Sequence, residues 1–342
     1  MTNLSEVLVH VYRGERLESL HRGHVAVVDT TGRVLAYAGD PYATTFFRSA
    51  AKPMQALNVV FSGAADRFGF TQEELAVMCG SHYGESFHVE AVRSILEKAS
   101  VPVTALRCPA SLSMNGVVAL RQAREGVEPN PLFSNCSGKH GGMLAACAAK
   151  AYDVATYDRP EHPVQREVLH ILSELCGVAA SRIGIGEDGC GVPVHYMPLY
   201  NMALGYAQFA NPSGLSQEYR VACARMFGAM QAAPEMVSGT AGFCTELMRY
   251  TGGRLMAKLG AEAVYCVGVK DRNIGIAVKI EDGTGSRATA PAVIEVLRQL
   301  DVLRDDEVDN LHRFVRPENR NEHGHVVGGI EPVFRLHRVN VA

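Results

Sequence analysis

The sequence lacks long apolar runs and blocks of charge of one sign. No stretch reaches the roughly 18 uncharged apolar residues that a membrane-spanning helix needs. The net charge is −3, and acidic and basic residues are interspersed, which argues against nucleic acid or a membrane surface as the main partner. Residues 1–10 do not show the basic segment and apolar run of a signal peptide. We therefore expect a cytoplasmic protein.

Cysteine pairs are also missing. The nine cysteines are an odd number, lie singly along the chain and form no CxxC pair, which excludes a disulfide framework. Cys136 and Cys190 have polar residues and glycines as neighbours, whereas most of the others are expected to be small buried hydrophobic residues. The cysteines in apolar runs are Cys79, Cys147, Cys176, Cys223 and Cys266.

The pattern of apolar residues predicts strands near both termini and helices between them. Expected strands are residues 6–10, 24–29, 33–37, 254–259, 264–269, 274–280 and 333–339, and a short buried strand at 183–186. The polar stretch 316–329 is expected to be a loop. We predict an α+β fold in which one antiparallel sheet is built from both termini, with a helical lobe beside it. No linker divides the chain, so residues 1–342 are expected to form one catalytic domain of two lobes with a cleft between them.

The segment from Cys136 to Gly142 places a thiol, a hydroxyl, an amine and an imidazole within five residues, beside glycines. Such polar groups are costly to bury unless they are paired, so they are expected to bind or react. Three roles are open, namely anion binding at a helix start, a thiolate nucleophile, or metal binding. A phosphate loop is excluded, because the spacing GxxxxGK is missing.

Ser49 and Lys52 form an S-x-x-K pattern at the start of a predicted helix that holds Pro53 in its first turn. Ser49 is expected to be the helix N-cap. Lys52 would share its face and accept the serine proton. This is the Ser-Lys arrangement of penicillin-recognising enzymes, in which a late strand lysine, here Lys258, faces the helix. Taken alone, the pattern is weak and favours a capping serine and a solvated lysine; the neighbouring Arg48 and the late strand lysine strengthen the catalytic interpretation.

Two further glycine-bordered turns carry polar groups. Ser81 and His82 follow Gly80, and Ser81 is able to orient a substrate, relay a proton or cap a helix. Asp188 precedes Cys190 on a turn, where Asp188 suits a substrate ammonium. If Cys190 meets Cys136, the two thiolates suit Zn²⁺. The alternative without a function, for both segments, is a turn exposed to solvent.

Taken together, the segments 48–55, 80–82, 135–142 and 188–193 resemble the asparaginase II family of the Rhizobium etli type, which is separate from the threonine-dependent bacterial and the plant-type asparaginases. The resemblance runs from the first hairpin to Lys279. It implies hydrolysis of L-asparagine to L-aspartate and ammonia, a fold similar to serine β-lactamases and glutaminases, and a homodimer.

The resemblance also implies a set of catalytic residues. Ser49 pairs with Lys52, and Ser81 pairs with a late strand lysine, which we place at Lys258, with Lys270 as the less favoured choice.

For binding, the resemblance implies a zinc ion held by Cys136, Lys139 and Cys190, with water as a further ligand. Asp188 and His140 are expected nearby. We predict that the substrate is bound by Arg48, His82, Asp188 and His140.

Two other classes of protein compete with this interpretation. The S-x-x-K pattern permits a penicillin-type peptidase or β-lactamase, although the paired thiols speak against it. A non-enzymatic zinc- or thiol-sensing protein built on Cys136 and Cys190 is the second alternative, and it would not need Ser49.

Overall fold

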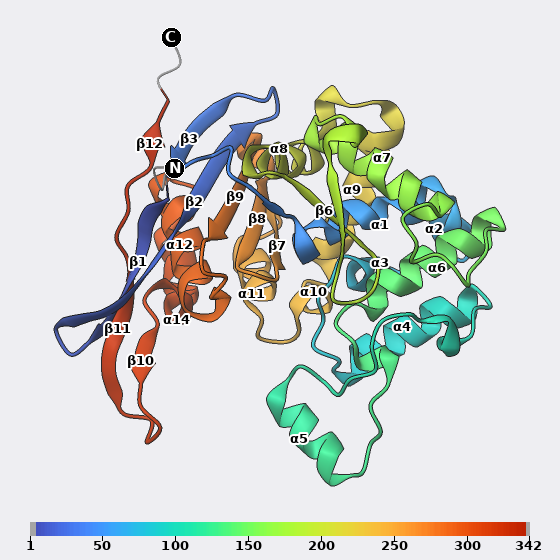
Figure 1. The fold of residues 1–342 in the computed structure, drawn as a ribbon, viewed down its shortest axis with the longest axis horizontal. Coiled ribbons are helices and arrows are strands. Elements are labelled where there is room, and N and C mark those ends of the chain that lie inside the picture. The colour runs from blue at the N-terminus through green and yellow to red at the C-terminus, as the bar shows by residue number, and fades with distance from the viewer. Residues whose placement is uncertain (1–4, 340–342) are drawn as a thin grey trace. The chain divides into compact units, whose positions relative to one another are not determined.

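The computed structural model describes residues 5–339, so the ends of the predicted 1–342 domain lie outside the described residues (Figure 1). The chain divides into two compact units. The first comprises the described parts of Met1–Ala50, Met197–Asn211 and Glu246–Ala342, and the second comprises Ala51–Tyr196 and Pro212–Thr245. The chain thus leaves the first unit and returns to it twice.

The first unit is built on an antiparallel sheet from both ends of the chain. Its strand order is β10-β11-β1-β2-β9-β8-β7, with β3 beside β2 and β12 beside β3. Val25 on β2 lies opposite Val278 on β9, so the N-terminal and C-terminal strands meet at the centre of the sheet. The predicted α+β class is confirmed. The strands are β1 (Glu6–Arg13), β2 (Arg16–Asp29), β3 (Val34–Ala38), β7 (Leu255–Gly260), β8 (Val264–Val269), β9 (Ile274–Ile280), β10 (Glu318–Arg320), β11 (Val326–Pro332) and β12 (His337–Arg338).

Two predictions at the C-terminal end are wrong. The stretch expected to be a loop contains β10 and β11, and the expected last strand is reduced to the short β12. β11 pairs with the outer edge of β1, where Val11 lies opposite Ile330. The backbone of β1 therefore supplies the hydrogen bonds that make a polar, glycine-containing segment a strand. Residues of β11 are mostly half-buried or exposed, which explains why an apolar pattern is absent.

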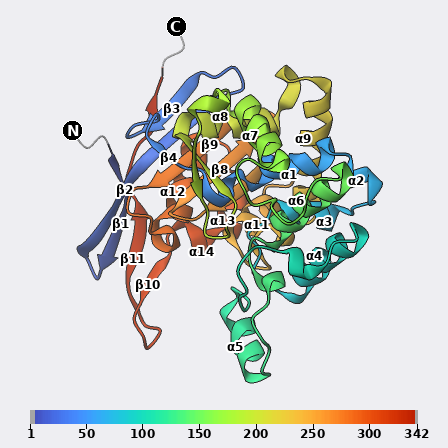
Figure 2. The same cartoon turned by 45° about the vertical axis from the view of Figure 1, so that its right-hand side comes forward.

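Helix α8 packs closely on the sheet of the first unit through glycines. A Cβ atom on Gly275 would lie 1.8 Å from the carbonyl oxygen of Ala203, and one on Gly268 would lie 2.5 Å from that of Tyr206. Figure 2 shows α8 close to β8 and β9. Both faces of these strands are buried, which leaves the opposite face to α12. The helices of this unit are α8 (Leu199–Ala210), α12 (Gly285–Gln299), α13 (Asp305–Asn310) and α14 (His312–Val315).

We expect Gly275→Ala to destabilise the protein by about 1–3 kcal/mol, because the added methyl group forces α8 away from the sheet. Thermal or urea unfolding measures the effect. Gly329→Ala on β11 is the matched control, because a Cβ atom there meets no atom within 4 Å. Equal stability of the two variants would contradict close packing at Gly275.

The second unit is mainly helical, and its centre is α1, in which Lys52 to Val59 are all buried. α1 contacts α6, α7 and α9. The helices are α1 (Lys52–Phe61), α2 (Ala64–Arg67), α3 (Gln72–Met78), α4 (Ser86–Lys98), α5 (Gly116–Arg124), α6 (Ser137–Lys150), α7 (Pro163–Cys176), α9 (Gln217–Ala232) and α10 (Glu235–Ser238), while α11 (Phe243–Tyr250) begins in this unit and ends in the first. The short strands of this unit are β5 (Gly184–Glu187) and most of β6 (Pro193–Pro198), whereas β4 (Thr44–Phe46) belongs to the first unit. The strand predicted at residues 183–186 corresponds to β5, but its predicted burial is wrong, because no residue of β5 is buried.

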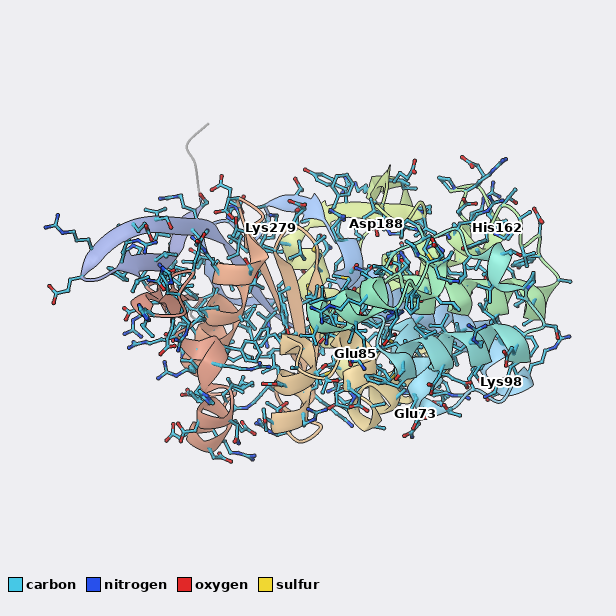
Figure 3. The ribbon with its side chains drawn as sticks, turned by 90° about the horizontal axis from the view of Figure 1, so that it is seen from below. Glu73, Glu85, Lys98, His162, Asp188 and Lys279 are labelled. Carbon is cyan, nitrogen blue, oxygen red and sulfur yellow. The ribbon has the colours of Figure 1, made fainter. Side chains whose placement is uncertain are left out.

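Local sequence explains several of these helix boundaries. Thr71 and Glu74 form a capping box at the start of α3. His162, labelled in Figure 3, accepts a hydrogen bond from the backbone of Val164 at the start of α7. On α6, a Cβ atom at Gly138 would lie 2.2 Å from the carbonyl oxygen of Val77. The glycine of the polar segment therefore permits close packing of α6 on α3.

The predicted role of Ser49 as helix N-cap is wrong. The helix α1 begins at Lys52 with Ala51 as its N-cap, and Ser49 lies in the preceding 3₁₀ helix η1 (Arg48–Ala51). Arg48 has a φ of 50°, a left-handed conformation that is unfavourable for residues with a side chain. The chain changes direction at Arg48 and enters α1 through the 3₁₀ helix η1, which is wound more tightly than an α-helix. The N-cap of α1 is therefore Ala51.

Candidate functional site

Lys52, the first residue of α1, is fully buried in the second unit and has three hydrogen-bond partners. Its Nζ lies 2.8 Å from the carbonyl oxygen of Gly80, 3.0 Å from that of Asn135 and 3.0 Å from Ser81 Oγ. Carbonyl oxygens only accept hydrogen bonds. A charged Lys52 donates to all three oxygens, whereas a neutral Lys52 would donate to the two carbonyls and accept from the Ser81 hydroxyl.

The surroundings make this amine less basic than an ordinary lysine. Burial is the largest influence and lowers the pKa of Lys52, a nearby Cys136 thiolate opposes this, and the positive charge of Lys139 adds to it. The net pKa lies below the ordinary value of a lysine. The lower pKa makes the proton-accepting, neutral form of Lys52 more accessible than that of an ordinary lysine.

The backbone around Ser81 is fixed by close packing. Its N–H donates to the carbonyl oxygen of Val237 at 2.8 Å. A Cβ atom on Gly80 would lie 2.5 Å from the carbonyl oxygen of Met236. Only glycine fits there, so the sequence Gly80-Ser81 places this part of the backbone against α10.

His82 is neutral and both of its ring nitrogens are used within the protein. Nδ1 accepts from the N–H of Gly84 at 3.1 Å, so Nε2 carries the proton and donates to Ser137 Oγ at 2.8 Å. Ser137 in turn donates to the carbonyl oxygen of Leu132. Burial holds the pKa of His82 well below its ordinary value, and His88 stacks on its ring. This arrangement fits a residue that positions the Ser81 loop.

The two distinctive cysteines meet in the second unit, together with Asp188. Atoms of Cys136, Asp188 and Cys190 that are able to bind a metal all lie within 4.8 Å of one another. Lys139 Nζ lies 3.0 Å from Cys190 Sγ and 3.8 Å from Asp188 Oδ2. Asp188 (Figure 3) and Cys190 lie on the turn between β5 and β6, where Gly191 adopts a φ of 89°. Cys136 and Lys139 belong to the start of α6.

The charges within this cluster are unequal. The pKa of Cys136 lies well below its ordinary value, first because the Cys190 thiol donates a hydrogen bond to it, and further because Lys52 and Lys139 are cationic. The same hydrogen bond and burial raise the pKa of Cys190. Burial lowers the pKa of Lys139, but the charges of Cys136, Cys190 and Asp188 outweigh it and raise the net value. One thiolate therefore lies between two lysines whose pKa values are shifted in opposite directions.

This donor set fits a zinc ion. Cys136 and Cys190 are both 5% exposed, and two sulfur atoms with one nitrogen or oxygen atom are ligands that Zn²⁺ prefers. A thiolate is already favoured at Cys136. Lys139 must lose its proton to bind a metal, whereas a carboxylate such as that of Asp188 is already a suitable ligand.

Two buried histidines near the cluster have an unpaired ring nitrogen among residues 5–339. The Tyr157 hydroxyl accepts from the N–H of Arg107 and donates to His140 Nδ1 at 2.6 Å, so His140 Nε2 carries a proton and is buried without a partner. His195 Nδ1 is likewise unpaired. Burial, with the charge of Lys139, lowers the pKa of His195 to about 4. The sequence analysis missed His195, which lies in a strand with no distinctive motif.

Ser49, Arg48 and Lys258 belong to the first unit, where the turn that carries Ser49 lies beside the β7 strand that carries Lys258. A Cβ atom on Gly260 would lie 3.1 Å from the carbonyl oxygen of Phe47 and 3.2 Å from the N of Ala50, so the turn that carries Ser49 packs on this face of β7. Lys258 shares that face, because side chains alternate along a strand. Lys258 is fully buried, whereas Lys270 is exposed.

The Ser49 turn is also held from α8. The Tyr206 hydroxyl donates to the carbonyl oxygen of Ala50 at 2.7 Å. Arg48 Nη1 lies 4.0 Å from a carboxylate oxygen of Glu262. Ser49 is half-buried, which suits a hydroxyl that must meet a ligand.

A family model described as L-asparaginase II matches residues 9–332. No curated protein matches the chain. Among residues 5–339, no helix is both long and apolar enough to cross a membrane.

Solved structures that resemble the chain are distant in sequence. The native form of Mglu is 14% identical, with a TM-score of 0.46, over 84% of this chain and 63% of that chain. A β-lactamase from Mycobacterium bovis is 13% identical, with a TM-score of 0.42, over 82% of this chain and 95% of that one. A Bacillus glutaminase is 12% identical, with a TM-score of 0.36, over 82% and 91% of the two chains. The chain thus spans less than two thirds of the length of Mglu.

Proposed function

The chain belongs to the L-asparaginase II family, and from this premise we propose that it hydrolyses L-asparagine to L-aspartate and ammonia, as an enzyme of the Rhizobium etli type. An amidohydrolase is the class of enzyme that the family supports. The observation that carries the proposal is the buried Lys52 with its Nζ 3.0 Å from the Ser81 hydroxyl. A buried amine in contact with a hydroxyl is the device that serine hydrolases with a lysine base require.

In the proposed reaction, Ser49 Oγ attacks the side-chain amide carbon of asparagine. Lys52 takes the serine proton, directly or through Ser81, and delivers it to the leaving nitrogen. Ammonia departs, a β-aspartyl ester on Ser49 remains, and water hydrolyses it to aspartate. Lys258 adjusts the charge around the Ser-Lys pair. The relay is supported by the contact of 3.0 Å between Lys52 Nζ and Ser81 Oγ.

The start of α1 supplies the second requirement of the reaction. Backbone N–H groups at a helix start carry a partial positive charge, although here Pro53 has no N–H and that of Ala50 donates to the carbonyl oxygen of Phe47. Placed against the oxyanion of the tetrahedral intermediate, one such donor is worth about 3–4 kcal/mol of barrier. Ser49 precedes Lys52, the first residue of α1, by one turn of η1.

We propose that the cluster on α6 and the β5–β6 turn binds zinc through Cys136, Lys139 and Cys190. When bound, the metal supplies positive charge and Lewis acidity that orient the substrate. Asp188 is suited to the substrate ammonium, because its carboxylate lies beside the cluster. His140 is suited to donate through its unpaired Nε2–H.

Arg48 is the cation nearest to Ser49 in the sequence and is proposed to bind the substrate carboxylate, while His82 is proposed to act through the Ser81 loop. A cytoplasmic location and a homodimer complete the proposal.

The deciding experiment is ammonia release by the purified protein from L-asparagine, with L-glutamine in parallel and with zinc added or chelated. Asparagine-selective release supports the proposal. No release under any condition, together with hydrolysis of nitrocefin, would establish the penicillin-type alternative. Tight zinc binding with neither reaction would establish a thiol- or zinc-sensing protein.

We expect Cys136→Ala to raise KM for asparagine by about tenfold, because loss of a ligand weakens the group that orients the substrate. Steady-state kinetics and thermal unfolding check this result. Cys147→Ala, which removes a fully buried thiol from the apolar part of α6, is the matched control and should leave KM unchanged. A large fall in Tm with an unchanged KM for Cys136→Ala would show a structural role instead.

A further inference from the structure

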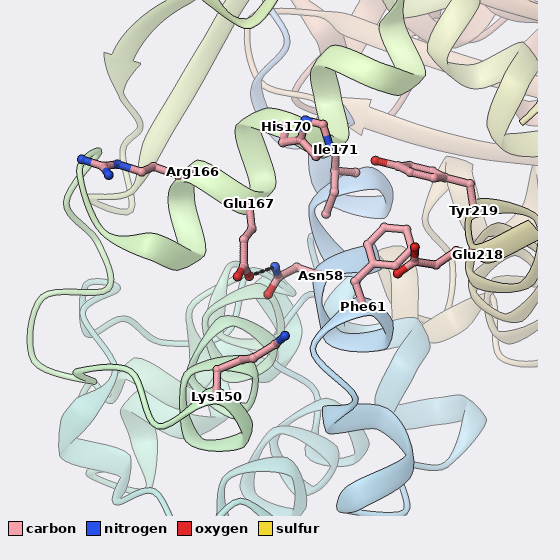
Figure 4. Close-up of a pocket in the computed structure, with 9 residues that line it drawn as sticks. All are labelled: Asn58, Phe61, Lys150, Arg166, Glu167, His170, Ile171, Glu218 and Tyr219. Carbon is pink, nitrogen blue, oxygen red and sulfur yellow. Dashed lines mark hydrogen bonds between the residues drawn. The ribbon is translucent and has the colours of Figure 1, made fainter. Parts of the chain in front are cut away.

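A pocket separate from the candidate site lies in the helical unit, among α1, α6, α7 and α9, and has a volume of about 450 Å³ (Figure 4). None of the residues proposed for catalysis or metal binding lines it. A pocket of this size suits a small molecule. Its polar, charged and aromatic groups are arranged in a way that limits which molecule fits.

The polar floor of the pocket is formed by Asn58 and Glu167. Asn58 is 1% exposed, and its Nδ2 donates to Glu167 Oε2 at 2.7 Å. This bond fixes the orientation of the amide. Asn58 Oδ1 is then a buried acceptor with no hydrogen-bond partner among residues 5–339. A buried acceptor without a hydrogen bond lowers the stability of the protein by about 1–3 kcal/mol. A ligand that donates a hydrogen bond to Asn58 Oδ1 would remove this cost.

Two opposite charges border the floor. Lys150 at the end of α6 and Glu218 on α9 have no ion-pair partner among the described residues, and both line the pocket. Figure 4 shows Lys150, Asn58 and Glu167 turned towards the same space. Arg166 also lines the pocket, but Figure 4 shows its guanidinium directed away from the space that Lys150, Asn58 and Glu167 share. The carboxylates of Glu167 and Glu218 therefore disfavour phosphates and nucleotides. The lysine on the other side favours a single carboxylate.

An apolar wall completes the pocket. The rings of Phe61 and Tyr219 lie 4.8 Å apart at 59° to each other, and Ile171 is buried beside them. Tilted aromatic rings of this kind accept a further apolar or aromatic group. A ligand without such a group would leave this wall exposed to water.

We propose that this pocket binds a free α-amino acid with an apolar or aromatic side chain. The ligand ammonium donates to Asn58 Oδ1 and is attracted by Glu167 and Glu218, its carboxylate pairs with Lys150, and its side chain packs on Phe61 and Tyr219. The inference does not depend on the proposed asparaginase reaction.

The test is calorimetric titration of the full chain with L-phenylalanine. Phenethylamine, which lacks the carboxylate, and 3-phenylpropionate, which lacks the ammonium, are the comparison ligands. We expect L-phenylalanine to bind with a millimolar or lower Kd and each comparison ligand to bind at least about tenfold more weakly. Phe61→Trp adds a second readout, because the chain contains no tryptophan of its own, so ligand binding should change the emission of that one residue.

Variants separate the charge contacts from general stability. Lys150→Gln is expected to weaken L-phenylalanine by about tenfold and to leave phenethylamine unchanged, because only the amino acid has a carboxylate. The matched control is Arg182→Gln, an exposed cation of the same unit outside the pocket. Asn58→Leu should abolish binding, and Lys150→Gln keeps the test valid if that variant does not fold.

Two results would overturn the proposal. One is the absence of binding by L-phenylalanine, L-leucine and L-methionine up to about 10 mM, a range that covers weak ligands. The other is phenethylamine binding as tightly as L-phenylalanine and equally in Lys150→Gln, since the pocket would then take organic cations. Ammonia release from asparagine is measured alongside, so that failure of the pocket and failure of the proposed reaction are told apart.

Discussion

Replacement of Ser49 by alanine is expected to lower kcat for asparagine by about 10⁴-fold or more, because removal of the nucleophile leaves only the binding contribution to catalysis. Stability should change little. Ser49 is half-buried in a 3₁₀ turn and has no role as helix N-cap, and alanine is compatible with such a turn. Single-turnover kinetics, with thermal unfolding alongside, measure both quantities.

Ser62→Ala is the matched control for this variant. Ser62 follows the last residue of α1, and its hydroxyl bonds only locally, to the carbonyl oxygen of Val59 and the N–H of Ala64. The control should retain full activity. Near-normal turnover by Ser49→Ala would reject Ser49 as the nucleophile and move the assignment to Ser81 or Cys136.

Lys52→Met is expected to reduce kcat by about 10²–10⁴-fold, the usual contribution of a general base. The methionine side chain fills a similar volume but has no proton acceptor of comparable strength. Unlike the serine variant, this one should also unfold at a lower temperature. The buried carbonyl oxygen of Gly80 and the carbonyl oxygen of half-buried Asn135 would lose their donor, and a buried unpaired group costs about 1–3 kcal/mol.

Ser81→Ala separates these two effects of Lys52. It removes the hydroxyl partner but leaves the lysine with its two carbonyls, so we expect reduced activity with a smaller loss of stability. The measurements are kcat and Tm for both variants. If Lys52→Met kept kcat within about tenfold of the parent, the lysine would be a structural cation and not the base.

The central strands were predictable because their signals are local. The segment 24–37 consists of two mainly apolar runs around a turn at Gly32, and the strands at 254–280 are short apolar runs separated by turns. β10 and β11 carry no such signal, since they become strands through pairing with β1. The exposed edge of a sheet does not require apolar residues, so its sequence resembles that of a loop.

The same distinction applies to the candidate site. Cys136, Lys139, Asp188 and Cys190 stand out in the sequence because polar groups and glycines are crowded there, and the fold does bring these four together. The partners of individual atoms were not predictable. The bond between Lys52 and Ser81 depends on how α1 packs beside the Gly80 turn.

The missed residues show the same limit. Asn58 and His195 are ordinary polar residues in apolar segments, and their unpaired atoms are evident only once the surrounding packing is known. His82 was selected for its neighbours in sequence, yet both of its nitrogens bond to Ser137 and Gly84. Which side chains remain available to a ligand is therefore a property of the tertiary structure.

The pairing of β2 with β9 determines how late during synthesis the central sheet is able to form. Val25 emerges from the ribosome early, but its partner Val278 follows only after most of the chain has been made. Strand β2 therefore has an unpaired apolar edge until β9 has been synthesised. By then, all residues of the helical unit that lie between the two strands have already been added to the chain. Contacts so distant in sequence slow folding and expose strand edges to aggregation. We expect chains that end before β9 to engage chaperones or aggregate, even though they contain every residue of the proposed zinc site.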